Sequence, residues 1–389
     1  SHANSFSGDT TVSAGTLQLA ASGALPSSTN VTLQNAAGAL LDLNGYSQQV
    51  ASLGGGGGAG GNVRLGNGTL TVGSGNFAGV IQGGGGGGGL IKTGAGQLSL
   101  SGSAGHFLPL GTLVHQGFLS LNSTLHLSVT TPMLVIGTST SSAVVEYGNA
   151  HQFATPTQVQ FLASGTSSTM KLNGFDQTVG AIVSGAYGDG AIFNGGTASA
   201  ALTVNTGTAS TFSGVIADGG PAGLGLVKTG TGQLRLSGSA AQFTGPTQVL
   251  QGFFQLNLTT SFAPTNLLIG MVSGTAPARV VAEQDIVAPS TTVTFFNGTG
   301  IHGGTLLLNM TTSIFDKLVS YAPGDGIVEN GGFAPCTITL SPVGSGTFSG
   351  IIRDGAGPSG PLSLVIDGPG EQWLSGTLGN TFTGSTTVY

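Results

Sequence analysis

Eleven residues decide the fold, and the chain contains them in two nearly identical copies: "KTGAGQLSLSG" at Lys92–Gly102 and "KTGTGQLRLSG" at Lys228–Gly238. Apolar and polar residues alternate in the second half of each copy, which is typical of a β-strand with one buried face. We therefore expect an inward-facing set and an outward-facing set of side chains. The inward set comprises Leu98, Leu100, Leu234 and Leu236, and Ser99 and Arg235 share one outward position.

Other sequence markers recur in the same order around this motif. Phe77, Phe212 and Phe348 begin "FAGVI", "FSGVI" and "FSGII", and they are 135 and 136 positions apart. A fixed long period is the signature of a solenoid, in which each coil contacts only its neighbours. The markers predict an all-β solenoid spanning 1–389 as one elongated domain. Its repeat units are 1–106 (shortened), 107–242 and 243–381, each built on a period of about 136 residues, and 382–389 begins a further unit.

Glycine marks the turns of this expected solenoid. Gly15, Gly117 and Gly252 occupy one position of the repeat, where a tight turn would require positive φ. Gly83–Gly89 is a run of seven glycines, each of which would weaken a strand by about 0.5–1 kcal/mol relative to alanine. We therefore expect this run to form a loop outside the strand ladders.

The composition excludes several classes of protein. The chain has only eight lysines and arginines and a net charge of −6, which argues against nucleic acid as a partner. No run of eighteen apolar residues predicts a membrane-spanning helix. Cys336 is the only cysteine, so there is no disulfide framework or cysteine zinc site, and its inward phase predicts a small buried side chain.

The stretch from Gly225 to Asn257, "GLVKTGTGQLRLSGSAAQFTGPTQVLQGFFQLN", resembles the autotransporter-associated β-strand repeat. Gly89–Phe107 repeats its first half, whereas the copy ending at Gly376 departs from it, with Ile366 and Asp367 in place of Lys-Thr. The resemblance implies a right-handed parallel β-helix, exported to the surface of a Gram-negative bacterium. It implies a scaffold without catalytic residues or cofactors.

A β-helix can also carry a polysaccharide lyase or hydrolase, which is the alternative function. Hydrolysis by two carboxylates needs a facing acidic pair, but the fourteen acids of this chain are dispersed. Asp218 and Asp354 correspond across repeats, as do Asp189 and Asp325, and each lies in an Asp-Gly turn. Aspartate in such a turn usually accepts hydrogen bonds from its own backbone, although stacked turns could also bind calcium.

Four histidines fall close together in the sequence but follow no metal-ligand spacing. They are His106, His115, His126 and His151. We expect them to be surface or core side chains, and we expect no metal site and no enzymatic activity.

Two side chains at the variable outward position are candidates for a contact surface. Trp373 and Arg235 occupy the position of Ser99, and Trp373 is the only tryptophan. Exposed tryptophan and arginine are favoured at protein contacts. The apolar phase shifts at Gln372, which leaves burial of Trp373 an equally good reading.

Both ends of the chain stop in the same phase of the repeat, at "SFSGDTTVS" and "TFTGSTTVY", without a charged or helical cap. Uncapped strand edges recruit further strands. We therefore predict an extracellular, surface-displayed structural or adhesive solenoid whose partners are cell-surface or matrix components and copies of itself joined head to tail. The expected assembly residues are Phe6, Val12, Leu17 and Leu19 at one end, and Phe382, Val388 and Tyr389 at the other.

Overall fold

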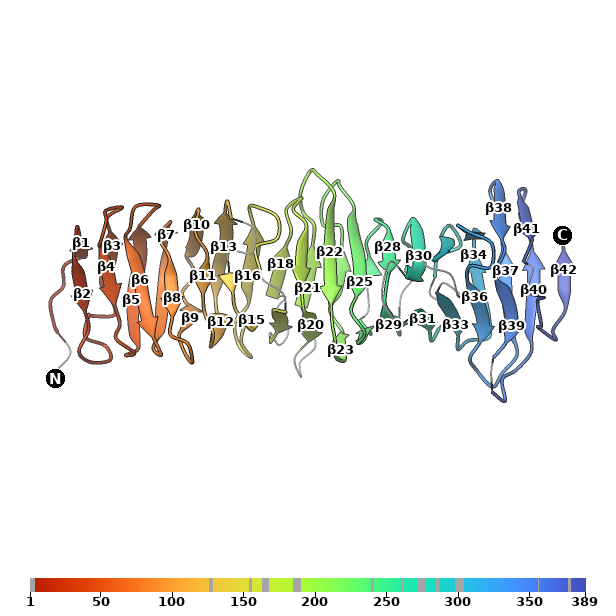
Figure 1. Ribbon diagram of the computed structural model, residues 1–389, viewed down its shortest axis with the longest axis horizontal. Coiled ribbons are helices and arrows are strands. Elements are labelled where there is room, and N and C mark those ends of the chain that lie inside the picture. Colours follow the sequence, from red (N-terminus) through yellow and green to blue (C-terminus); the bar gives the residue numbers. More distant parts are fainter. Residues whose placement is uncertain are drawn as a thin grey trace. The chain divides into compact units, whose positions relative to one another are not determined.

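The computed structural model describes residues 4–125, 129–153, 156–162, 168–184, 190–238, 241–259, 262–271, 277–284, 287–297, 304–355, 357–376 and 379–389. Strands and turns make up these residues, and none of them is helical. The chain divides into two compact units, Ser1–Ala200 and Ala201–Tyr389. Within each unit, parallel strands stack as a β-solenoid, which confirms the all-β fold class (Figure 1).

Two sheets form most of the first unit. The long sheet follows the order β20-β17-β15-β12-β9-β7-β10-β13-β16-β18-β21, with β1, β3 and β5 joined to it through β7. Its strands are β1 (Thr10–Val12), β3 (Asn30–Leu33), β5 (Gln48–Gly55), β7 (Thr69–Phe77), β9 (Gly89–Lys92), β10 (Gln97–Gly102), β12 (Gly111–Val114), β13 (Gly117–Ser123), β15 (Met133–Ile136), β16 (Ala143–Tyr147), β17 (Gln158–Phe161), β18 (Ser168–Lys171), β20 (Ala181–Ser184) and β21 (Gly190–Phe193). The second sheet runs β14-β11-β8-β6-β4-β2, and its strands are β2 (Thr16–Gln18), β4 (Leu40–Asp42), β6 (Asn62–Gly66), β8 (Ile81–Gly83), β11 (His106–Phe107) and β14 (Val129–Thr130). The unit also contains β19 (Gln177–Val179), and β22 (Ala200–Asn205) lies at the division.

The second unit is built in the same way from smaller sheets. One sheet contains β25 (Leu224–Thr229), β28 (Thr247–Val249), β30 (Asn266–Met271), β32 (Thr292–Asn297) and β35 (Lys317–Ser320). Another contains β23 (Ser210–Phe212), β26 (Gln233–Leu236), β29 (Gly252–Leu256), β31 (Ala278–Ala282), β33 (Thr305–Leu308), β36 (Ile327–Asn330) and β39 (Ile351–Asp354). The remaining strands are β24 (Val215–Ala217) with β27 (Ala241–Gln242), β34 (Thr312–Phe315) with β37 (Cys336–Leu340), β40 (Leu362–Ile366) and β42 (Thr386–Val388), and β38 (Ser345–Phe348) with β41 (Glu371–Leu374).

Buried side chains stack in columns because equivalent strands of successive coils pair in parallel. Leu98 of β10 lies opposite Leu119, which lies opposite Val145. In the second unit Leu234 begins a buried column that continues from coil to coil through Phe254, Val280, Leu306, Val328 and Ile352. The prediction for Leu98, Leu100, Leu234 and Leu236 is confirmed, since all four are buried. Cys336 is also buried, as its phase predicted.

The glycine positions follow the prediction closely. Gly15, Gly117 and Gly252 have φ of 70°, 73° and 72°. At Gly117 an added Cβ would lie 2.4 Å from the carbonyl oxygen of Gly94 in the preceding coil, so the coils stack closely at this corner. The run of glycines forms a turn over 84–88, as expected, but the expectation is wrong for its ends, because Gly83 closes β8 and Gly89 opens β9.

The repeated motif also carries a buried lysine, which the alternation of leucines did not reveal. Lys92 Nζ donates hydrogen bonds to the carbonyl oxygens of Thr93 (2.6 Å), Gly94 (2.7 Å) and Gln116 (3.1 Å). Lys228 is fully buried in the same way and donates to three carbonyls at 2.7, 2.8 and 3.1 Å. Burial lowers the pKa of both ammonium groups to about 8, so they stay charged at neutral pH. Each lysine therefore ties its own turn to the turn of the next coil.

Candidate contact surface at the C-terminal coil

The buried columns of the second unit become exposed at its last coils. Leu340 of β37 lies opposite Ile366 of β40, which lies opposite Val388 of β42. Leu340 is fully buried, Ile366 is half-buried and Val388 is 71% exposed. Parallel pairing covers each side chain with the following coil, and within residues 1–389 no strand follows β42 to cover Val388. Leu374 is exposed for the same reason, opposite the buried Phe348.

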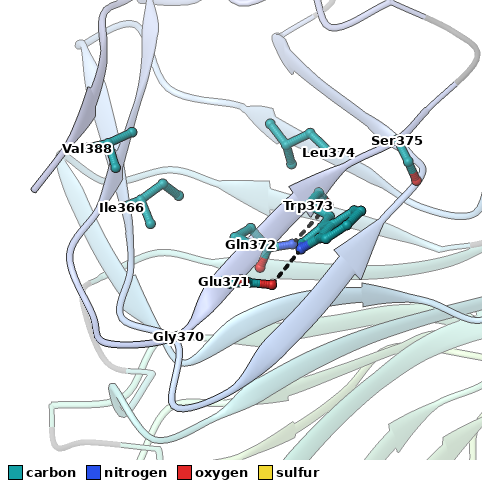
Figure 2. A pocket seen from close by; sticks show the side chains of 8 residues that line it. All are labelled: Ile366, Gly370, Glu371, Gln372, Trp373, Leu374, Ser375 and Val388. Carbon is teal, nitrogen blue, oxygen red and sulfur yellow. Dashed lines mark hydrogen bonds between the residues drawn. The ribbon is translucent and has the colours of Figure 1, made fainter.

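Trp373 lies at the side of this exposed face. Figure 2 shows its indole beside Glu371, with Ile366, Leu374 and Val388 around the same hollow. The ring is 60% exposed, and its Nε1 donates a hydrogen bond to Glu371 Oε2 at 3.0 Å. The hollow has a volume of about 540 Å³. Of the two sequence-based alternatives for Trp373, the structure shows the exposed one.

Gln372 explains why the apolar phase shifts before Trp373. Its side chain reaches the outermost strand of a neighbouring sheet, where it accepts a hydrogen bond from the amide of Leu318 and donates one to the carbonyl of the same residue, both at 3.0 Å. Leu318 belongs to β35, which ends its sheet. The side-chain amide of Gln372 thus takes the place of the backbone groups that a further strand would pair with β35. The sequence gives no indication of this role.

The other predicted end residues differ in exposure. Phe6 and Tyr389 are exposed and Leu17 and Phe382 are half-buried, whereas Val12 and Leu19 are buried under the following coil. In the described residues β1 pairs only with β3 and β42 pairs only with β40, so each of these strands has one unpaired edge.

Arg235 does not lie with Trp373. It occupies β26, half-buried between Thr211 and Gln255 of the adjacent coils, while Trp373 occupies β41 in a different sheet. Its Nε is buried without a hydrogen-bond partner among the described residues. The two predicted contact residues therefore do not form a common surface.

The aspartates of the Asp-Gly turns have the structural role that the sequence indicated. Asp218 accepts hydrogen bonds from the Leu224 amide at 2.6 Å and from the Thr244 hydroxyl at 2.9 Å. Asp354 accepts from the Leu362 amide at 2.6 Å and from the Thr383 hydroxyl at 2.8 Å. Each carboxylate joins its own loop to the "FTG" segment of the next coil. Asp325 accepts a hydrogen bond from the Ala322 amide within its own turn, and Asp189 lies outside the described residues.

Asp354→Asn is expected to lower the free energy of unfolding by about 1–3 kcal/mol while leaving any binding activity intact. The amide NH2 cannot accept the two hydrogen bonds that Thr383 donates to Asp354 Oδ2. Urea denaturation of the variant measures the loss, with Asp367→Asn as the matched control because Asp367 is exposed. Loss of a polysaccharide-cleaving activity in a folded variant would instead indicate an enzyme.

The described histidines lie in separate environments. His106 is buried, and its Nδ1 accepts a hydrogen bond from the Ile81 amide at 3.1 Å. His115 and His151 are half-buried, and His126 lies outside the described residues. Across the part of the chain that the structure describes, no three histidine, cysteine, aspartate or glutamate side chains lie close enough to hold a metal ion.

Comparison with known proteins finds a repeat family that matches parts of this chain. A model of the passenger-associated-transport-repeat matches residues 1–19, 90–121 and 226–256. The second and third stretches contain both buried lysines and the buried leucines Leu98, Leu100, Leu234 and Leu236. The chain therefore contains passenger-associated-transport repeats over these stretches, which make up about a fifth of its length.

An autotransporter adhesin, BmaC of Brucella suis, is 53% identical to the chain over 78 residues. The matched stretch covers 20% of this chain and 2% of the Brucella protein. No solved structure matches the chain. No helix among the described residues has the length and apolar character needed to cross a membrane.

Proposed function

We propose that this passenger solenoid is an adhesive, non-enzymatic surface protein. The observation that carries the proposal is the passenger repeat itself, because the residues that characterise it form contacts within the scaffold. Lys92, Lys228 and Gly117 hold coil to coil, and Asp218 and Asp354 fasten loops. The outward positions are free to vary, which is what a display scaffold requires. Similarity to a protein named as an adhesin supports the same function.

The dispersed carboxylates support a non-enzymatic role over the alternative of a polysaccharide lyase or hydrolase. Asp218 and Asp354 accept hydrogen bonds from backbone amides of the scaffold. Asp42 and Glu329 are each held by an arginine at 2.6 Å. Two-carboxylate hydrolysis needs two such groups facing one substrate, and these acids are each bound within separate networks.

Adhesion can be tested with the chain displayed on a non-adherent bacterial host. Bacteria displaying residues 1–389 should attach to cultured epithelial monolayers more than the same host displaying only the export machinery. Soluble chain added in excess should compete, because the contact is saturable. Equal attachment with and without the displayed chain would contradict an adhesive function.

We propose further that copies of the 389-residue chain associate end to end. Thr10–Val12 of β1 and Thr386–Val388 of β42 have the same sequence at the same phase of the repeat, and each has an unpaired edge. Joining these edges would continue the ladder as β-augmentation and would cover Val388 and Leu374. The contact is heterologous, so it propagates an open filament instead of closing a dimer.

Deleting Ser1–Leu19 is expected to weaken end-to-end association far more than folding, because it removes β1 and β2 from one edge. Val388→Lys should have the same effect by placing a charge on the exposed face at the other end. Leu110→Lys, at an exposed position within the first unit, is the matched control. Sedimentation velocity over a concentration series measures the association. The intact chain remaining monomeric at high concentration would exclude this mode of assembly.

A further inference from the structure

Two surface hollows outside the C-terminal face each lie beside an acid–arginine pair. In the first unit Arg64 Nη2 lies 2.6 Å from Asp42 Oδ2, and in the second unit Arg353 Nη2 lies 2.6 Å from Glu329 Oε2. Both carboxylates are nearly buried, whereas the arginine side chains are 57% and 34% exposed. In each pair the arginine lies opposite the acid on the next coil.

The two pairs occupy the same outward column of the repeat. Asp42 and Leu307 both lie two residues before a marker asparagine, Asn44 or Asn309. Arg64 is paired in register with Asp42, and Glu329 is paired in register with Leu307. The ion pair therefore recurs in the same column of the repeat, but it lies one coil later in the second unit than in the first. At the same column of the middle repeat the side chains are Lys171 and Phe193, which lie opposite each other in register.

The first hollow is lined by groups that donate and accept hydrogen bonds. It has a volume of about 380 Å³, and Asp42 forms its base. Asp42 accepts from the Gln18 amide group at 2.9 Å, the Asn44 backbone amide at 2.9 Å and Arg64, which together fix the guanidinium. The hydrogen bond from Arg64 is the main cause that lowers the pKa of Asp42. The exposed side chains of Asn44 and Asn67 complete the lining and form no hydrogen bond with any described residue.

The second hollow is lined by the acid of the other ion pair and by an aromatic ring, whereas Arg353 is not among its lining residues. It has a volume of about 230 Å³ and lies between Glu329, Phe333 and the loop containing Gly355 and Ser359. Arg353 holds Glu329 through two nitrogens, Nε at 2.8 Å and Nη2 at 2.6 Å from Oε2. Phe333 is 85% exposed, so its ring face is available to an incoming ligand.

We propose that these two hollows bind neutral saccharides, a ligand class that rests on the adhesive function proposed above. Hydroxyl groups both donate and accept, and in the first hollow they match a fixed guanidinium beside amide side chains. The ring of Phe333 can pack against the apolar face of a sugar. Each ion pair is electrically neutral and the chain carries a net charge of −6, so an acidic glycan is disfavoured. Two sites on one chain, displayed in many copies on a cell, would combine weak single contacts into firm attachment.

The test is a glycan microarray carrying neutral, sialylated and sulfated oligosaccharides, probed with beads coated with the 389-residue chain. We expect binding to neutral structures. Arg64→Met and Phe333→Ala should each weaken it about tenfold, the effect of losing one strong contact in a site, and together they should abolish it. Phe333 is 85% exposed, so its replacement by alanine is expected to change stability little. Lys171→Met, on the same column, is the matched control, and urea denaturation checks each fold.

Several results would overturn the inference: no binding to any neutral glycan, binding confined to sialylated or sulfated glycans, or unchanged binding by the double variant. The attachment assay separates this inference from the adhesive function. If bacteria displaying the chain attach to cells while the array shows no neutral-glycan binding, adhesion stands and the ligand class is wrong. If neither occurs, the adhesive function itself fails.

Discussion

Lys92→Met and Lys228→Met are each expected to lower the free energy of unfolding by about 3 kcal/mol. Methionine has nearly the shape of lysine, so the column stays filled. It removes the ammonium group that serves three carbonyls, one of them in the next coil. Those carbonyls would remain turned toward an apolar side chain.

The position of each lysine explains why methionine tests the ammonium group alone. Lys92 lies opposite Val72 and Val114 in adjacent coils, and Lys228 lies opposite Val249. The methylene stem therefore packs in an aliphatic column, and only the tip is polar. In the third copy of the motif this position is Ile366, which supplies an aliphatic side chain without an ammonium group.

Urea denaturation followed by circular dichroism measures the effect as a lower midpoint. Lys171→Met is the matched control, because Lys171 is half-exposed and should tolerate the change within about 0.5 kcal/mol. A midpoint for Lys92→Met that equals the wild-type value would show that the carbonyls find other donors, and that the lysine is dispensable to the fold.

The solenoid could be predicted because its signals are local and repeated. Alternation at Leu98 and Leu100 defines the buried face, and Gly117 and Gly252 mark the corners by their need for positive φ. Successive coils repeat this alternation and these corner glycines, so one correctly interpreted motif predicts the burial of many residues. The turn role of Asp218 followed from the Asp-Gly sequence in the same way.

Contacts between coils could not be predicted, because they depend on which residues the stacking brings together. The link from Asp354 to Thr383, the pairing of Arg64 with Asp42, and the reach of Gln372 to Leu318 each join residues more than twenty positions apart. The register that sets them varies with loop length from coil to coil. Lys92 gave a usable signal, since lysine recurs at one position of an otherwise apolar strand.

His106 is expected to make the first unit sensitive to acid. It is buried in β11, and desolvation lowers its pKa to about 4 from the ordinary value of 6.5. Its Nδ1 accepts from the Ile81 amide, so the neutral ring must carry its proton on Nε2. A second proton would have to enter at Nδ1, against the Ile81 N–H, and Nε2 has no hydrogen-bond partner among the described residues.

Because the folded-state pKa lies below the unfolded-state value, the unfolded chain binds more protons between pH 4 and pH 6.5. The stability contributed by neutral His106 is fully present above pH 6.5 and is lost as the pH falls toward 4, by about 3 kcal/mol in all.

The measurement is the urea midpoint at pH 7.5, 6 and 4.5. His106→Leu should be less stable than wild type at pH 7.5, where the Ile81 amide loses its acceptor, yet its midpoint should change less with pH. His115→Gln is the matched control, because it removes a histidine that is only half-buried. The same pH slope in His106→Leu and wild type would assign the acid sensitivity to other groups.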